Sequence, residues 1–159
     1  MSDLYEVRLL GFPLRLHALA LEHHEELVRE FQLLALDPGS AHSVPRRLVD
    51  LVAELTAAYG AFTDTANADR DAAAARGEER VDLTYVVPAS AAAAAAQLGR
   101  MLDEADEFCR DGDRLLTLAS SPETAALRHW QLSEFAAQVE GAEPTPWDVW
   151  AARHPVPVG

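Results

Sequence analysis

Apolar residues recur at helical spacing over four long segments, and this pattern constrains the fold more than any other feature of the sequence. The segments cover about residues 14–36, 43–76, 90–110 and 121–141. In the first of them, Leu16, Leu19, Leu27, Phe31 and Leu34 follow multiples of the helical repeat. Amphipathic helices bury their apolar stripes most simply against one another. The sequence therefore predicts a mainly α protein built as an antiparallel four-helix bundle.

Local signals place the ends of these helices. The run DPGS at 37–40 ends the first helix, and Ser43 is a candidate N-cap for the second. Roughly 30 residues is long for a globular helix, so a break near Gly60 is an alternative to one continuous helix. Residues 121–123 (SPE) combine a cap, a proline at the first helical position and an acid in the first turn. We expect Gly141 to end that fourth helix.

Two short segments, 4–10 (LYEVRLL) and 81–87 (VDLTYVV), have the alternation and the β-branched or aromatic content of strands. Gly11 and Pro13 bound the first segment, and Pro88 closes the second. Each one is followed by a proline and then by a long amphipathic helix. This likeness predicts that the two strands pair in a small β element and that the chain carries an internal pseudo-duplication.

The last part of the chain differs in composition from the helical body. We expect residues 1–141 to form a single helical domain and 142–159 to form a tail with too many prolines for a regular element. Tryptophans are common anchors of protein interfaces, but they are costly to leave exposed. The tail residues therefore either pack back over the end of the bundle or bind a partner protein. The candidate partner-binding residues are Trp147, Trp150, Pro144 and Pro146.

Charge and hydropathy exclude several classes of function. The formal net charge is −13 and the pI is about 4.7. A protein that binds nucleic acid or an anionic membrane surface needs a basic footprint, so we expect neither partner. No stretch approaches the roughly 20 apolar residues of a membrane span, and the first ten residues have acids where a signal peptide would carry positive charge. These features predict a soluble, cytoplasmic protein.

The segment 16–31, LHALALEHHEELVREF, places His23 and His24 in the first helix. One hypothesis makes either imidazole a phosphoacceptor, because the pair is similar to the phosphoacceptor helix of one histidine-kinase class. That class continues with basic and asparagine residues, whereas Glu25 and Glu26 would here repel a phosphate. The other interpretation places both histidines at the boundary between core and rim, hydrogen-bonded to glutamates.

The same histidines do not predict a metal site. Adjacent helical residues point about 100° apart, so His23 and His24 cannot bind one ion together. A di-iron carboxylate bundle needs two Glu-x-x-His motifs on facing helices, and the sequence contains none. A metal-binding bundle is therefore the least favoured function, and we expect no cofactor.

Signatures of catalysis are also missing from the sequence. Cys109 lies near the end of a helix, where the helix dipole disfavours a thiolate. Neither GxGxxG nor GxxxxGK[ST] occurs, and the acidic run 103–113 does not fit a calcium-binding EF-hand loop. We therefore expect no enzyme activity. The acids that we expect on a solvated helix face are Asp103, Glu104, Asp106 and Glu107.

Two blocks of sequence resemble a known group of proteins. They are GFPLRLHALALEHHEELVREF, near the N-terminus, and LDEADEFCRDGDRLLTLASSPETAALRHWQLSEFAAQVEG with the following PTPW. Together they are similar to a group of actinobacterial helical proteins associated with partner-switching signalling. The resemblance implies a regulatory protein-interaction module whose partner is an anti-sigma-factor kinase or a STAS-domain protein. A homodimer is a further expectation, because a strand edge left open can pair with a second copy.

Overall fold

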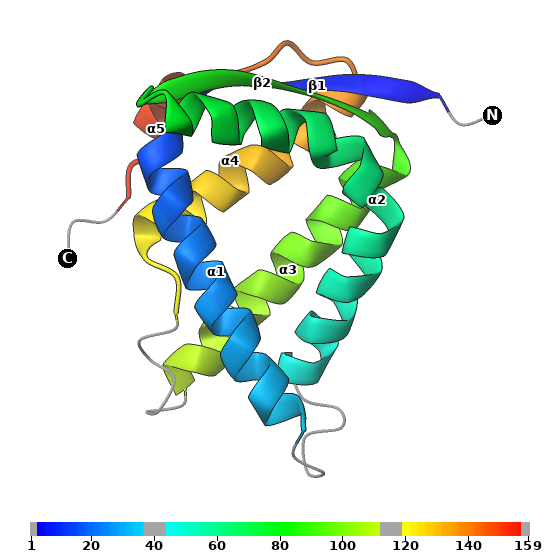
Figure 1. Cartoon of the computed structure of the whole chain (residues 1–159), viewed down its shortest axis with the longest axis vertical. Coiled ribbons are helices and arrows are strands. Elements are labelled where there is room, and N and C mark those ends of the chain that lie inside the picture. The colour runs from blue at the N-terminus through cyan, green and yellow to red at the C-terminus, as the bar shows by residue number, and fades with distance from the viewer. Residues whose placement is uncertain (1–2, 37–43, 112–118, 157–159) are drawn as a thin grey trace.

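The computed structural model describes residues 3–36, 44–111 and 119–156, and within them the protein is mainly α-helical (Figure 1). The described part contains five helices and one two-stranded sheet, which confirms the mainly α prediction. In chain order the elements are β1 (Leu4–Pro13), α1 (Leu14–Ala35), α2 (Val44–Ala75), β2 (Arg80–Pro88), α3 (Ser90–Asp111), α4 (Pro122–Val139) and α5 (Trp147–Arg153). The predicted helix stop at 37–40 and the predicted N-cap Ser43 lie outside the described residues.

The two strands pair, as the sequence predicts, and the structure shows that the pairing is antiparallel, with Val7 opposite Tyr85 and Leu9 opposite Leu83. Alternate residues of each strand are buried, so one face of the sheet packs on the helices. β1 runs past the glycine expected to end it, because the register shifts between Leu9 and Phe12 and lets the chain continue. Gly11 lies in this irregularity at a φ of 66°, and its N–H donates to Asp82 Oδ1 at 2.8 Å.

The four long helices contact one another in a ring: α1 packs on α2, α2 on α3, α3 on α4, and α4 on α1. Helix α2 also packs against β2, whereas α4 packs against β1. In Figure 1, α2 first runs alongside α3 and then turns to pass beneath the sheet. The helix is continuous over its 32 residues, so of the two alternatives left open by the sequence, the described helix has no break near Gly60. Thr63 Oγ1 donates to Gly60 O at 3.0 Å, a local side-chain bond of the kind that bends helices.

The buried side chains form two clusters that correspond to the two directions of α2. The cluster under the sheet contains Ala66 and Ala73 from the second part of α2, packed with both strands and Trp130. The other cluster lies at the far ends of the helices and contains Leu48 from the first part of α2, with Phe31 and Cys109. The long bent helix therefore contributes to both halves of the core. The residues of the first cluster with at most 2% exposure are Val7, Leu9, Phe12, Ala66, Ala73, Leu83, Val87, Leu127 and Trp130.

The prediction of an irregular tail was wrong within the described residues, because 147–153 form α5. Pro144 and Pro146 precede the helix and do not interrupt it, and Pro146 occupies the N-cap position. Thr145 lies just before the helix, and its backbone ties the tail to α4. Its N–H donates to Glu134 Oε1 at 2.7 Å, and its carbonyl accepts from Trp130 Nε1 at 2.9 Å. The division of the chain into a domain at 1–141 and a tail at 142–159 stays a prediction.

Candidate functional site

The predicted histidines lie beside a hollow between α1, α3 and α4, of about 250 Å³. His17, His23 and His24 line it from α1, while Arg128 and Gln131 line it from α4. The remaining lining is largely apolar, with Leu21, Leu27, Leu98, Leu102, Leu127 and Leu132 among its residues. We call this region the histidine hollow.

Both predicted histidines are half-buried, which agrees with a position at the boundary between core and rim. Leu27 follows them one turn later and is buried in the core, so the pair lies on the inward flanks of α1. Glu25 and Glu26, which follow the pair in sequence, are both exposed. The imidazoles of His23 and His24 therefore line the hollow, whereas the carboxylates of Glu25 and Glu26 lie in solvent.

Burial keeps two of the three histidines uncharged at neutral pH. Loss of hydration lowers the pKa of His17 to about 4, and the nearby charge of Arg70 lowers it further. The pKa of His24 is also lowered, first by burial and then by the proximity of His23. A neutral imidazole has one nitrogen that donates and one that accepts a hydrogen bond. Two of the imidazoles that line the hollow, those of His17 and His24, can therefore each donate one hydrogen bond and accept another.

An ion-pair network lies at the α4 side of the hollow. Arg128 Nη2 contacts Asp103 Oδ1 at 2.7 Å and Asp106 Oδ2 at 3.0 Å. Asp106 Oδ1 accepts from both the N–H and the hydroxyl of Ser120, each at 2.9 Å. Asp106 is only 3% exposed, so its predicted place on a solvated helix face was wrong, whereas Glu104 and the other two acids are exposed as expected. Asp106 lies three residues before the buried Cys109 and so on the same side of α3, but its burial depends on Arg128 and Ser120, which come from outside that helix.

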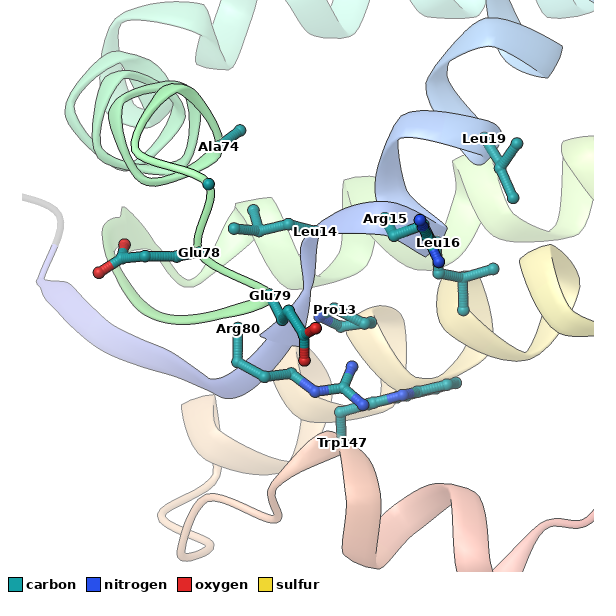
Figure 2. A pocket seen from close by; sticks show the side chains of 11 residues that line it. Pro13, Leu14, Arg15, Leu16, Leu19, Ala74, Glu78, Glu79, Arg80 and Trp147 are labelled. Atoms are coloured by element: carbon teal, nitrogen blue, oxygen red, sulfur yellow. The ribbon is translucent and has the colours of Figure 1, made fainter.

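A larger groove lies on another side of the molecule, beside the tail. Its volume is about 780 Å³, and Figure 2 shows its side chains arriving from α1, from the connection between α2 and β2, and from α5. We call it the Trp147 groove. Leu19 is 56% exposed there, although its helical spacing predicted a place in the core stripe. The residues that matter for its chemistry are Arg15, Leu16, Leu19, Glu78, Arg80 and Trp147.

Three of the four predicted partner-binding residues of the tail are half-buried, and the fourth is buried. Trp147 is 8% exposed and packs edge-on against Trp130, with ring centroids 5.5 Å apart. Trp150 is half-buried and stacks on Trp147 at 5.9 Å, while Pro144 and Pro146 are also half-buried. The tryptophans thus pack back on the body, and Trp147 also forms part of the wall of a groove. Sequence reasoning missed the groove residues of α1 and β2, because the contact with α5 joins segments far apart in the sequence.

Arg80 links the groove wall to the tail helix. Its Nη2 lies 3.2 Å from Asp148 Oδ1, and both side chains are about half exposed or more. Leu14 N–H donates to Glu79 O at 3.1 Å, which joins the start of α1 to the segment before β2. The ion pair thus joins β2 to α5, and the hydrogen bond joins α1 to the segment before β2. The groove between these segments is lined by both positive and negative side chains.

The described residues offer little for metal or thiol chemistry. Within them, no group of three or more His, Cys, Asp or Glu side chains lies close enough together to hold a metal ion. Cys109 is buried, and loss of hydration, followed by the negative charge of Asp106, raises the pKa of its thiol to about 11. A thiol with that pKa is protonated at neutral pH and is a poor nucleophile. None of the described helices combines the length and apolar character needed to cross a bilayer.

The sequence matches no protein-family model and no curated protein, and no solved structure matches the chain.

Proposed function

We propose that the protein is a non-catalytic regulatory module that binds a partner protein in the Trp147 groove. The observation that carries the proposal is the exposure of Leu19 at the rim of a concave surface whose wall includes a buried indole. Exposed apolar groups that line a concave surface are typical of protein-binding sites. The groove therefore provides an apolar anchor point in a chain whose surface is otherwise rich in acids.

The apolar and charged side chains of the groove indicate which kind of partner segment fits it. Leu16 and Leu19 favour an apolar side chain of the partner, whereas Arg15 and Glu78 supply opposite charges near it. A segment with one or two apolar anchors flanked by both acidic and basic residues matches this pattern. The resemblance to partner-switching proteins supports an anti-sigma-factor kinase or a STAS-domain protein as the source of that segment, in the cytoplasm of a bacterium.

We also propose that the chain carries an internal duplication and that its long helices form an antiparallel four-helix bundle. The order strand, helix, helix occurs twice along the chain before α5, which supports an internal duplication. The ring of contacts among α1, α2, α3 and α4 supports an antiparallel four-helix bundle. A homodimer formed by strand pairing would need a free strand edge, and Gln138 already occupies the β1 edge through two 2.8 Å hydrogen bonds with the backbone of Arg8. Strand pairing between copies would therefore use the edge on β2.

The test compares two leucines of α1 with similar exposure. Leu19 lines the groove and is 56% exposed, whereas Leu33 is 59% exposed on the same helix and does not belong to the groove lining. Purified kinase and STAS-domain proteins from the same genome are titrated calorimetrically against wild type, Leu19→Glu and Leu33→Glu. We expect one of them to bind wild type, Leu19→Glu to weaken binding at least about tenfold, and Leu33→Glu to leave it unchanged.

Two results would contradict the proposal. The first is equal binding by the two glutamate variants, because binding then does not depend on the groove leucine more than on a remote leucine. The second is that neither protein binds wild type at micromolar concentration. Circular dichroism of each variant shows whether the helices are intact before binding is compared.

Histidine phosphotransfer through His23 or His24 stays the second candidate. The neutral state of His24 favours it, because only an uncharged imidazole attacks a phosphoryl group. The exposed Glu25 and Glu26 beside the pair oppose it. Incubation with a phosphodonor kinase tests it: the hypothesis requires an acid-labile phosphohistidine that disappears in the double variant His23→Ala/His24→Ala. Label that survives in this variant excludes both residues as acceptors.

A further inference from the structure

The outer side of β2 presents backbone groups that the two-stranded sheet does not use. Along an antiparallel pair, residues alternate between exchanging hydrogen bonds with the partner strand and directing their N–H and C=O away from it. Arg8 directs both groups to Gln138, so Arg8 and its partner Thr84 do not bond to each other. Thr84 therefore directs its N–H and C=O away from β1. Val86, two residues later in the same register, does so too.

The two edges of the sheet differ in what covers them. The side chain of Gln138 closes the β1 edge. Among residues 3–36, 44–111 and 119–156, no backbone or side-chain group bonds to the outward N–H and C=O of Thr84 and Val86. An open strand edge of this kind pairs readily with another extended segment. We call the outward side of residues 82–86 the β2 edge.

Helix α2, which packs on β2, carries two exposed side chains beside the β2 edge. One stripe of this helix meets the sheet at helical spacing, and its members are Phe62, Ala66, Asp69 and Ala73. The two alanines are buried, whereas Phe62 is 40% exposed and Asp69 is exposed. Arg70, on the other flank of the stripe, acts on buried groups beneath the sheet, and its side chain is only 15% exposed. The exposed part of the stripe therefore lies on the flank beyond β2, where a third strand would lie.

The β2 edge has an apolar end and an acidic end. The second part of α2 and β2 run in opposite directions, because the short connection 76–79 joins the end of the helix to the start of the strand (Figure 1). Phe62 therefore lies toward the end of β2, where Val86 is 46% exposed on the outer face of the sheet. Asp69 lies toward the start of β2, where Asp82 is exposed on that face. An added strand would thus meet apolar groups at one end and carboxylates at the other.

Charge and shape favour a partner protein over a second copy at this edge. Two copies related by a two-fold axis would pair their β2 strands antiparallel and place the acidic end of each against the apolar end of the other. Their α2 helices would lie beneath strands about 4.8 Å apart, whereas packed helices need about 8–10 Å between their axes. The net charge of −13 also favours a basic partner over another acidic copy. A single extended segment of another protein avoids all three conflicts.

We propose that the β2 edge binds an extended segment of a partner protein, which joins the sheet as a third strand. The segment places apolar side chains at the apolar end of the edge and basic side chains at the acidic end. Thr84 and Val86 supply the backbone pairing, and the two ends of the edge supply the selectivity. The surface is distinct from the Trp147 groove, because Phe62, Thr84 and Val86 lie outside the described lining of that groove.

The experiment uses a fluorescein-labelled peptide of the sequence Thr-Val-Ile-Val-Thr-Val-Arg-Arg, with a blocked C-terminus. In antiparallel pairing, its first residues meet the apolar end of the β2 edge and its arginines meet the acidic end. A control peptide has glutamate in place of both arginines. By fluorescence anisotropy, we expect the full chain to bind the arginine peptide with a Kd below about 1 mM, and the glutamate peptide at least about tenfold more weakly. Absence of binding by the arginine peptide overturns the proposal, and so does equal binding of both peptides.

Two proline variants locate the peptide on the sheet. The N–H of Thr84 points to the β2 edge, and the N–H of Glu6, by the same alternation, points to the opposite edge on β1. Proline at either position removes an N–H that the pairing of β1 with β2 does not use, and edge strands tolerate such a proline. We expect Thr84→Pro to weaken binding of the arginine peptide at least about tenfold, and Glu6→Pro to change it much less. Equal binding by the two variants contradicts the proposal.

A pair of charge variants keeps the test decisive if Thr84→Pro fails to fold, as circular dichroism would show. Asp69→Arg reverses a charge at the acidic end of the edge. Asp71→Arg makes the same change two residues later, on the far side of α2, where the Asp71 side chain is 74% exposed. We expect Asp69→Arg to lower the preference for the arginine peptide at least about fivefold, and Asp71→Arg to lower it much less. Equal effects of the two variants overturn the proposal.

Sedimentation of the full chain with and without the arginine peptide distinguishes a partner segment from a second copy. A dimer that the peptide dissociates assigns the β2 edge to a second copy and contradicts the proposal. Peptide binding that leaves the oligomeric state unchanged supports it.

Discussion

Replacing Trp147 with alanine tests whether the tail helix belongs to the core. The indole is 8% exposed and contacts both Trp130 and Trp150. A tryptophan side chain buries roughly 200 Å², which at about 25 cal/mol per Å² gives an upper bound of about 5 kcal/mol. The methyl group that alanine retains and the compactness of the unfolded chain reduce this value. We therefore expect Trp147→Ala to lower the free energy of unfolding by about 3 kcal/mol, at the lower end of measured tryptophan-to-alanine losses.

Urea denaturation followed by circular dichroism at 222 nm measures this loss. With a denaturant slope of about 2 kcal/mol per M, the midpoint falls by about 1.5 M. Val149 lies on the same short helix and is 41% exposed, so Val149→Ala is the matched control with a change below about 0.5 kcal/mol. A loss under about 1 kcal/mol for Trp147→Ala would refute the placement of α5 against Trp130.

Three further predictions follow from the packing and the pKa shifts. A Cβ added at Gly99 would overlap Leu132 Cδ1, so the leucine side chain must move in Gly99→Ala, whereas a Cβ at Gly60 meets open space. We therefore expect Gly60→Ala to raise the free energy of unfolding by up to about 1 kcal/mol and Gly99→Ala to raise it less or to lower it. Urea midpoints that do not separate in this order contradict the contact. Gln138→Leu removes two hydrogen bonds to the β1 backbone and one of the two donors to Glu134 Oε1, so a loss of about 1–3 kcal/mol is expected in the same assay, and a change within about 0.5 kcal/mol speaks against the bonds. The pKa of His17 is about 4 in the folded protein and 6.5 in the unfolded chain, so between pH 6.5 and pH 4 the unfolded chain binds the proton more readily and the free energy of unfolding falls as the pH falls. We therefore expect the urea midpoint to drop less between pH 7 and pH 5 in His17→Phe than in wild type. An equal drop in both proteins refutes the burial of this imidazole.

Local patterns were enough to predict the strands and most helix ends. The alternation in VDLTYVV places Leu83, Tyr85 and Val87 on the buried face, as observed. Ser121 caps α4 by accepting from the N–H of Thr124 at 3.2 Å, and Gly141 follows that helix at a φ of 100°. These features depend on residues within one turn of each other, so the sequence contains the information directly.

The features that escaped prediction depend on contacts between distant segments. The tail helix forms because Trp147 packs on Trp130 while the prolines stay outside the helix, and a count of prolines does not show this. The buried state of Asp106 depends on Arg128 and Ser120 from beyond α3. The two pockets arise where elements from different parts of the chain fail to fill the space between them. Periodicity describes one element at a time and cannot predict such spaces.

The central claim, that a partner protein docks in the groove beside the packed tail, is tested most directly by hydrogen exchange with and without the bound partner. The claim predicts that peptides covering 14–19, 77–80 and 147–153 exchange more slowly in the complex. Peptides covering 29–36, at the opposite end of α1, should exchange at the same rate in both states. Slowed exchange confined to 29–36, with the three groove segments unchanged, would contradict the claim.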